Sequence, residues 1–192
     1  MRRLLGLGAV LVGAVALSGC TLVPTASSPQ RIARHQIPFG LMNKTIPGTN
    51  HGRVRFITQP VYIVDATGHL APSSRIVPSP PVLATVLRQL IVGPTQIESF
   101  AGYSSALPPT LILLSASIKS GVGYIDLASP LSHLSRADQI LAVGQLVLTA
   151  HDAGAASGII LTVAGERQRS LLPNGTRAST VTAGAFRALL NP

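Results

Sequence analysis

The clearest hydrophobic pattern in the chain lies between Ser79 and Thr95. Apolar residues recur there at spacings of one, three and four: Val82, Leu83, Val86, Leu87, Leu90 and Ile91. This spacing predicts a helix with one apolar side. Ser79 is expected to cap the helix with Pro80 at its first position, and Gly93 followed by proline is expected to end it. Such a helix buries its apolar side on a sheet, so strands are expected before and after it.

Two strands are predicted before this helix. Residues 54–58 and 61–65 are rich in β-branched and aromatic side chains, and Pro60 between them indicates a bend or an edge position. Residues 66–69 contain the glycine of a turn, and residues 70–77 form a second, weaker strand. The first half of the pattern is therefore strand, strand, helix.

The same order repeats after the helix. Residues 97–109 carry a glycine and two prolines and are predicted to be irregular. Residues 111–118 form a predicted strand, residues 119–121 a tight hairpin turn, and residues 122–127 the partner strand. The even positions of the first strand are expected to face inward, namely Ile112, Leu114, Ala116 and Ile118.

A second helix is predicted to begin after Ser135, because Asp138 stands three positions later in a capping-box arrangement. Gly154 is expected to end this helix, and four residues are expected to form its apolar face: Ile140, Val143, Gly144 and Val147. Residues 158–165 then form a buried strand with residues 166–172 as its expected partner, and Thr182 is predicted to cap a short final helix. The apolar residues of that final helix are Phe186, Leu189 and Leu190.

This order of elements predicts the α+β class. We expect a single small mixed-sheet domain built from two strand–strand–helix units, with the helices on one face of the sheet. The folded part is assigned to residues 51–192, a length of about 140 residues that suits one hydrophobic core.

The pattern of the first residues predicts an export signal that is not part of the folded domain. Arg2 and Arg3 precede an apolar run at residues 4–16 that is too short to span a membrane comfortably. Residues 1–19 are therefore predicted to be a signal peptide, with an uncleaved membrane anchor as the alternative. Residues 17–20 (Leu-Ser-Gly-Cys) resemble the lipobox of bacterial lipoproteins. That resemblance implies that Cys20 carries the lipid, begins the mature chain, and anchors it to the outer face of the bacterial cytoplasmic membrane.

Cys20 is the sole cysteine, which excludes a disulfide within the chain and a thiol catalyst elsewhere. Residues 20–50 are rich in proline, serine and glycine, which break every helical or strand period, so a flexible tether is predicted.

The chain is strongly basic, with 15 Lys and Arg against 6 Asp and Glu and a formal net charge of +9. The basic residues are scattered, without the stripe or the interleaved aromatic residues of a nucleic-acid site, so nucleic acid is not an expected partner. Anionic lipid headgroups or cell-wall polymers would suit a positive exported protein. An ordinary solvated basic surface is an equally acceptable interpretation.

Candidate chemistry was sought among five histidines and six carboxylates. His133 lies near Asp126 in sequence and beside Ser132, but the spacing does not bring a triad together. The pair of His151 and Asp152 lies at a predicted helix end, where an imidazole complements the dipole. There is no histidine pair at the spacing of helical metal ligands. We therefore predict no catalytic, cofactor-binding or metal-binding residues and no enzyme.

Six segments in sequence order resemble the GerMN domain, the sporulation and germination protein M type. They are residues 61–65 with Gly68, His69, Leu70 and Arg75, then residues 90–95, 102–108, 123–127, 145–149 and 163–165. The resemblance covers about residues 54–190. It implies a small mixed α/β module, usually on extracytoplasmic lipoproteins and similar to ring-building domains of sporulation complexes, without established catalytic residues.

Together these features predict a membrane-anchored, extracytoplasmic, non-catalytic lipoprotein module that binds or scaffolds another cell-envelope protein. The alternative is a lipoprotein that binds a small ligand or a cell-wall glycan, although three tyrosines and no tryptophan argue weakly against glycan stacking. A cryptic hydrolase that uses His133 is the third hypothesis.

Overall fold

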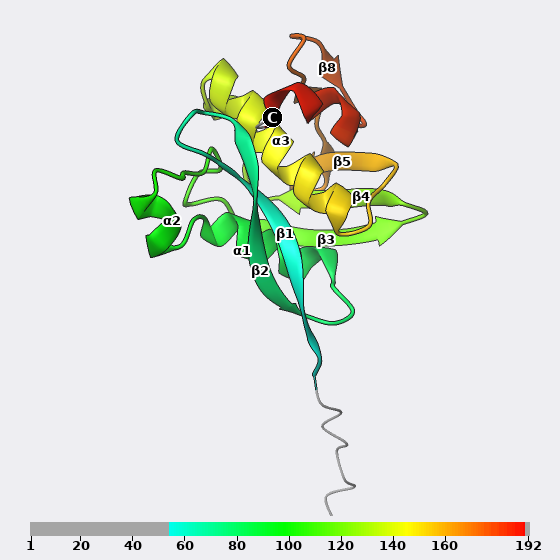
Figure 1. Cartoon of the computed structure of the whole chain (residues 1–192). Helices are drawn as coiled ribbons and strands as arrows, with labels where there is room; N and C mark the ends of the chain where they lie inside the picture. Colours follow the sequence, from blue (N-terminus) through cyan, green and yellow to red (C-terminus); the bar gives the residue numbers. More distant parts are fainter. Residues whose placement is uncertain (1–53, 191–192) are drawn as a thin grey trace, which may run out of the picture. The chain divides into compact units, whose positions relative to one another are not determined.

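Residues 54–190 are described by the computed structural model, and they form three sheets with helices packed between them (Figure 1). The predicted signal peptide (1–19), Cys20, the predicted tether (20–50) and the first residues of the predicted domain (51–192) lie outside the described residues. Those assignments stay predictions.

The first two strands of the described part form a long antiparallel ribbon. Strands β1 (Phe56–Val64) and β2 (Leu70–Pro78) pair along their whole length, and Pro60 sits in register opposite Ser74. The two predicted strand pieces are thus one continuous strand. A proline is tolerated because the other edge of β1 faces a helix instead of a third strand.

The second sheet is mixed. Its order is β3 (Leu113–Lys119), β4 (Val122–Leu127), β5 (Gly158–Val163) and β6 (Glu166–Arg167), with β4 and β5 parallel and the other pairs antiparallel. The predicted α+β class and mixed sheet are confirmed. The ribbon forms its own two-stranded sheet beside it.

A small hairpin and two short 3₁₀ helices complete the fold. Strands β7 (Ser170–Leu171) and β8 (Arg177–Ala178) form a two-stranded sheet. The 3₁₀ helices are η3 (Leu131–His133) and η4 (Ala183–Leu189). Thr182 is the N-cap residue of η4, as predicted, but its side chain makes no cap hydrogen bond. Burial of Phe186 holds η4 instead.

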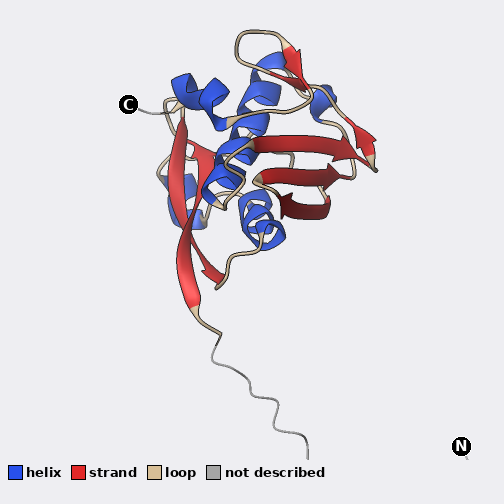
Figure 2. Cartoon of the chain, turned by 90° about the vertical axis from the view of Figure 1, so that its right-hand side faces the viewer, coloured by secondary structure: helices blue, strands red, loops and turns tan. Residues whose placement is uncertain are grey.

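Helices α1 (Leu83–Val92) and α3 (Arg136–Asp152) lie between the ribbon and the four-stranded sheet (Figure 2). They cover one face of that sheet, as predicted, and the ribbon covers their other side. The predicted cap of α3 is confirmed, since the Ser135 hydroxyl accepts a hydrogen bond from the Asp138 N–H. Because α3 is central, it is buried almost all round between Ala142 and Ala150.

The start of α1 differs from the prediction. The helix begins at Leu83, its N-cap is Val82, and no side chain caps it. The Ser79 N–H instead donates to the Arg55 carbonyl, so Ser79 continues the hydrogen bonding of the ribbon. The predicted end is confirmed, because Gly93 adopts a φ of +86° that favours glycine.

Residues 97–109 were predicted to be irregular, and that was partly wrong. Thr95 and Glu98 form a reciprocal capping box at the start of a second helix, α2 (Gln96–Phe100). Its signature, a threonine followed three residues later by a glutamate, stands in the sequence.

The predicted inward face of β3 was wrong in its first half. A bulge between Leu113 and Ser115 shifts the register, so Ile112 and Leu114 are exposed while Leu113 packs on the core. Beyond the bulge, Ala116 and Ile118 face the core as expected. A bulge adds one residue and so reverses which alternate positions face inward.

Candidate interaction surface

A buried arginine holds α2 against the ribbon. The Arg75 side chain leaves β2, and its Nη1 and Nη2 donate to Oε1 and Oε2 of Glu98, each at 2.9 Å. Nη2 also donates to the Gly93 carbonyl at 3.2 Å. This ion pair is the only one found within residues 54–190. Its bidentate geometry fixes α2 in direction as well as in distance.

The same carboxylate completes the cap of α2. Oε2 of Glu98 accepts from the Thr95 N–H at 2.6 Å, and the Ser73 hydroxyl donates to Oε1. These bonds, led by those from Arg75, lower the pKa of Glu98 to about 2. Glu98 is therefore ionised throughout the neutral range, and it fastens the short helix to two neighbouring segments.

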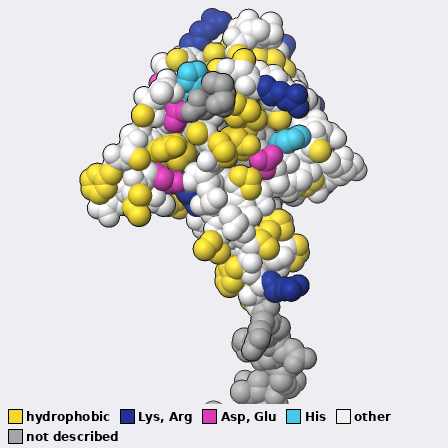
Figure 3. Space-filling model, in the orientation of Figure 1, with side chains coloured by type: hydrophobic (Ala, Val, Ile, Leu, Met, Phe, Trp, Pro, Cys, Tyr) yellow, Lys and Arg dark blue, Asp and Glu magenta, His cyan; other side chains and the backbone are white. Residues whose placement is uncertain are grey.

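The fastened helix carries large apolar side chains into solvent. Ile97 and Phe100 are three positions apart on one side of α2 and are 81% and 83% exposed, and Val92, at the end of α1, is 80% exposed. Apolar side chains gather over α2 in the space-filling view (Figure 3). We call Val92, Ile97 and Phe100 the α2 corner. Clustered apolar exposure of this kind is typical of an interaction surface.

A second polar network ties α3 to the free edge of β1. The buried Gln145 donates from Nε2 to the Tyr62 carbonyl at 2.9 Å, and its Oε1 accepts from the Ala106 N–H at 2.8 Å. One turn later, the Thr149 hydroxyl accepts from the Tyr62 N–H at 3.0 Å. The helix thus replaces a third strand in satisfying the edge of the ribbon.

Other residues that resemble the GerMN pattern also act in the scaffold. The carboxylate of Asp65 accepts hydrogen bonds from the backbone N–H groups of Thr67 and His69 and so closes the ribbon turn. A hydrogen bond from the Thr67 hydroxyl is the main cause of the lowered pKa of Asp65, and the two backbone bonds lower that pKa further. Val64 and Ser104 exchange two backbone hydrogen bonds. These motif residues therefore shape the domain.

The considered triad is not assembled. Asp126 accepts from the Thr162 hydroxyl at 2.6 Å and from the Gly165 N–H at 3.0 Å, and these bonds lower its pKa. His133 is exposed on η3 and makes no hydrogen bond with Asp126.

The end of α3 has a structural role. The Asp152 carboxylate accepts from the Tyr62 hydroxyl at 2.9 Å, and burial together with this bond raises the pKa of Tyr62 to about 12. Within the described part, Nδ1 of His151 is buried without a hydrogen-bond partner. No three His, Cys, Asp or Glu side chains among residues 54–190 are grouped to hold a metal ion.

The α2 corner was missed from the sequence, although the signal for its cap was present at Thr95 and Glu98. Cys20, the predicted lipid-attachment residue, lies outside the described residues. Among those that are described, no helix has the length and apolar character needed to cross a bilayer.

Solved structures share the fold, and two of them are described here as examples. The first GerMN domain of the sporulation protein GerM from Bacillus subtilis aligns with a TM-score of 0.51 and 16% identity, over 67% of this chain and 98% of that chain. The tandem GerMN domains of the same protein align with a TM-score of 0.52 and 16% identity, over 67% of this chain and 46% of that chain. This chain therefore spans less than half the length of the tandem structure.

No curated protein sequence matches the chain. The domain family to which these GerMN domains belong is not known as a family of enzymes. The family model Germane, described as sporulation and spore germination, matches residues 60–169, which is more than half of the chain. The ribbon, the mixed sheet and the helices between them lie largely within that match, and the chain belongs to the Germane family of sporulation and spore germination domains.

Proposed function

We propose that this protein is a membrane-anchored, extracytoplasmic, non-catalytic lipoprotein module that binds another protein of the cell envelope through the α2 corner. The observation that carries the proposal is a rigidly held helix whose large apolar side chains point into solvent. Membership of a family described by sporulation and germination supports a role in such an envelope process.

The contacts behind α2 favour protein binding. A surface that is already fixed loses little conformational entropy when a partner docks. Here the Arg75–Glu98 pair and the capping box immobilise α2 before any partner arrives. Phe100 is then an aromatic anchor for a partner pocket, the kind of side chain that concentrates binding energy.

The test compares two double variants with matched chemistry. Ile97→Ser with Phe100→Ser removes the α2 corner, whereas Phe56→Ser with Ile76→Ser removes an exposed phenylalanine and isoleucine from the outer side of the ribbon, where they are 62% and 73% exposed. All four side chains are exposed, so folding stability should change little. The readout is the size of the complex that contains this chain after gentle solubilisation of the envelope.

The wild type and the ribbon variant are expected in a complex larger than the chain alone, and the α2 variant is expected to migrate alone. Wild-type protein that migrates alone would overturn the binding proposal. A complex lost only in the ribbon variant would place the interaction on the other surface.

The anchor rests on the lipobox resemblance at residues 17–20 and has its own test. Intact mass of the exported protein should show a chain that begins at acylated Cys20, since several acyl chains are needed for stable anchoring. Cys20→Ser should shift the protein from the membrane fraction to the soluble fraction. A retained leader, or an unmodified thiol at Cys20, would contradict the anchor.

A further inference from the structure

One end of the β1–β2 ribbon projects beyond the rest of the described domain. Figure 1 and Figure 2 both show this end, which is the one where β1 begins. Further along β1, alternate side chains are buried from Gln59 onwards, whereas residues 54–56 are exposed. The end of the ribbon is therefore available to a surface outside the protein.

Large apolar side chains are exposed at this end. Val54, Phe56 and Ile76 are 60%, 62% and 73% exposed. In the register of the ribbon, Phe56 and Ile76 are diagonal neighbours on the same side of it, close enough for their side chains to form one apolar surface. We call Val54, Arg55, Phe56 and Ile76 the ribbon tip.

The charge at the ribbon tip is positive. The side chain of Arg55 is exposed, and its backbone is fixed because its carbonyl accepts a hydrogen bond from the Ser79 N–H at 2.7 Å. Figure 3 shows a basic side chain beside apolar ones at this end of the ribbon. The tip thus combines apolar side chains with a cation.

Carboxylates contact the ribbon further along its length. Glu98 does so at Arg75, with which it forms an ion pair. Asp152 does so at the Tyr62 hydroxyl, which is six positions and roughly 20 Å along the strand from Phe56. That separation exceeds the distance of about 8 Å over which salt screens charges at physiological ionic strength.

The sequence before the ribbon has the same sign of charge. Residues 20–64 contain no Asp or Glu, and their basic residues are Arg31, Arg34, Lys44, Arg53 and Arg55. Attraction to an anionic lipid surface increases with the number of basic residues close to it, and here no acidic residue of the same stretch opposes it.

We propose that the ribbon tip docks onto the anionic surface of the bilayer that carries the protein. Phe56 and Ile76 enter the boundary between headgroups and acyl chains, where aromatic side chains are favoured, and the long side chain of Arg55 extends to the lipid phosphates. The inference rests on the membrane anchor of the proposed function, since attachment through the residues before Val54 keeps the tip at a high local concentration beside the bilayer.

A protein partner suits the ribbon tip less well. A specific protein interface buries about 800 Å² on each partner, which is far more than a few side chains at the end of a two-stranded ribbon provide. A bilayer accepts a small apolar insertion without a matched shape, and its phosphates supply the complementary charge. Docking through the tip also uses none of the residues of the α2 corner.

The test uses the full chain as purified from the membrane and reconstituted into vesicles of phosphatidylcholine alone or of equal parts phosphatidylcholine and phosphatidylglycerol. A genetically encoded fluorescent amino acid that reports polarity replaces Ile76 or, as the matched control, Ile97, which is 81% exposed in the α2 corner. Flotation of the vesicles shows whether the chain is attached. Quenching by brominated lipid shows whether the fluorophore lies among the acyl chains.

Position 76 is expected to be quenched in the phosphatidylglycerol vesicles and less in the neutral ones, whereas position 97 stays in water in both. A floated chain whose position 76 stays in water would overturn the docking and leave the anchor standing. Equal quenching at positions 76 and 97, or equal quenching at position 76 in both lipids, would also overturn the docking. A chain that does not float would contradict the anchor and the docking together.

Variants separate the two contributions to docking. Arg55→Gln should lower the ratio of docked to undocked chain about fivefold in the phosphatidylglycerol vesicles, since one basic residue near the surface is lost. Phe56→Ser should reduce quenching at position 76 in both lipids. Both side chains are exposed, so folding stability should change little.

The matched control is Arg167→Gln, which changes an exposed arginine in β6 of another sheet and should leave docking unchanged. Quenching at position 76 that is unchanged in both Arg55→Gln and Phe56→Ser would contradict the assignment of the ribbon tip.

Discussion

Replacing Gln145 by leucine removes the side chain that joins α3 to both the ribbon and the segment around Ala106. Gln145 is fully buried, and leucine has a similar volume, so the change deletes hydrogen bonds without opening a large cavity. The Tyr62 carbonyl and the Ala106 N–H then lose their partners.

The magnitude follows from those two groups. Leaving a buried polar group unsatisfied costs about 1–3 kcal/mol. Both groups are only partly buried, so water can reach them and values near the lower end apply. The added apolar side chain returns about 1 kcal/mol of the roughly 2–4 kcal/mol lost. We therefore expect the free energy of unfolding to fall by about 1–3 kcal/mol.

Urea unfolding followed by circular dichroism measures this change. With a slope of about 1–3 kcal/mol per molar urea, the midpoint should fall by roughly 1 M. Amide hydrogen exchange at Ala106 should accelerate more than exchange within α3, because its acceptor is gone. Gln96→Leu, an exposed helical glutamine, is the control and should change stability by less than about 0.5 kcal/mol. Equal midpoints for Gln145→Leu and Gln96→Leu would refute the structural role of Gln145.

Three further predictions concern stability and titration. Because the pKa of Glu98 is lowered from 4.5 to about 2, its stabilising contribution is complete above pH 4.5 and is lost as the pH falls towards 2. Glu98→Gln should flatten that part of the curve of unfolding free energy against pH. An unchanged curve would count against the ion pair. Gly144→Ala should lower the free energy of unfolding by about 1–2 kcal/mol, because a Cβ at this position would lie 2.6 Å from Leu70 and 2.9 Å from Phe186. A variant that is more stable than the wild type in urea unfolding would disprove this packing. Ultraviolet absorbance should show Tyr62 ionising near pH 12, and its ionisation near pH 10 would contradict the buried hydrogen bond.

The regular elements follow from local patterns. The end of α1 at Gly93, the cap of α3 at Ser135 and the hairpin turn at residues 119–121 depend on single residues whose backbone preferences are visible in the sequence. The errors arise where a distant partner decides. Ser79 continues the ribbon because Arg55 offers its carbonyl, and no property of residues 79–83 announces that.

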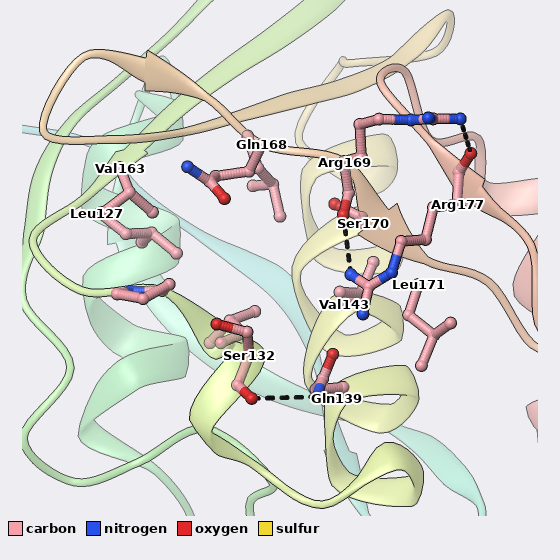
Figure 4. A pocket seen from close by; sticks show the side chains of 13 residues that line it. Leu127, Ser132, Gln139, Val143, Val163, Gln168, Arg169, Ser170, Leu171 and Arg177 are labelled. Carbon is pink, nitrogen blue, oxygen red and sulfur yellow. Dashed lines mark hydrogen bonds between the residues drawn. The ribbon is translucent and has the colours of Figure 1, made fainter.

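The candidate surface was harder to predict for a related reason. Ile97 and Phe100 have the spacing of a buried helical face, and only the packed structure shows that this face is turned outward. Arg75 and Glu98 are 23 positions apart, so their pairing cannot be inferred from spacing. In the same way, the residues drawn in Figure 4 come from six elements, namely β4, η3, α3, β5, β7 and β8, and from the segments that join them, and they become neighbours only after folding.

The central claim is that the α2 corner binds a partner protein outside the membrane. Site-specific photo-cross-linking in the intact envelope tests it most directly, with the reactive residue placed at position 97 or 100 and, as the control, at Phe56 on the ribbon. One adduct of defined mass is expected from positions 97 and 100, and none is expected from Phe56. Absence of that adduct, or an equal yield from Phe56, would contradict it.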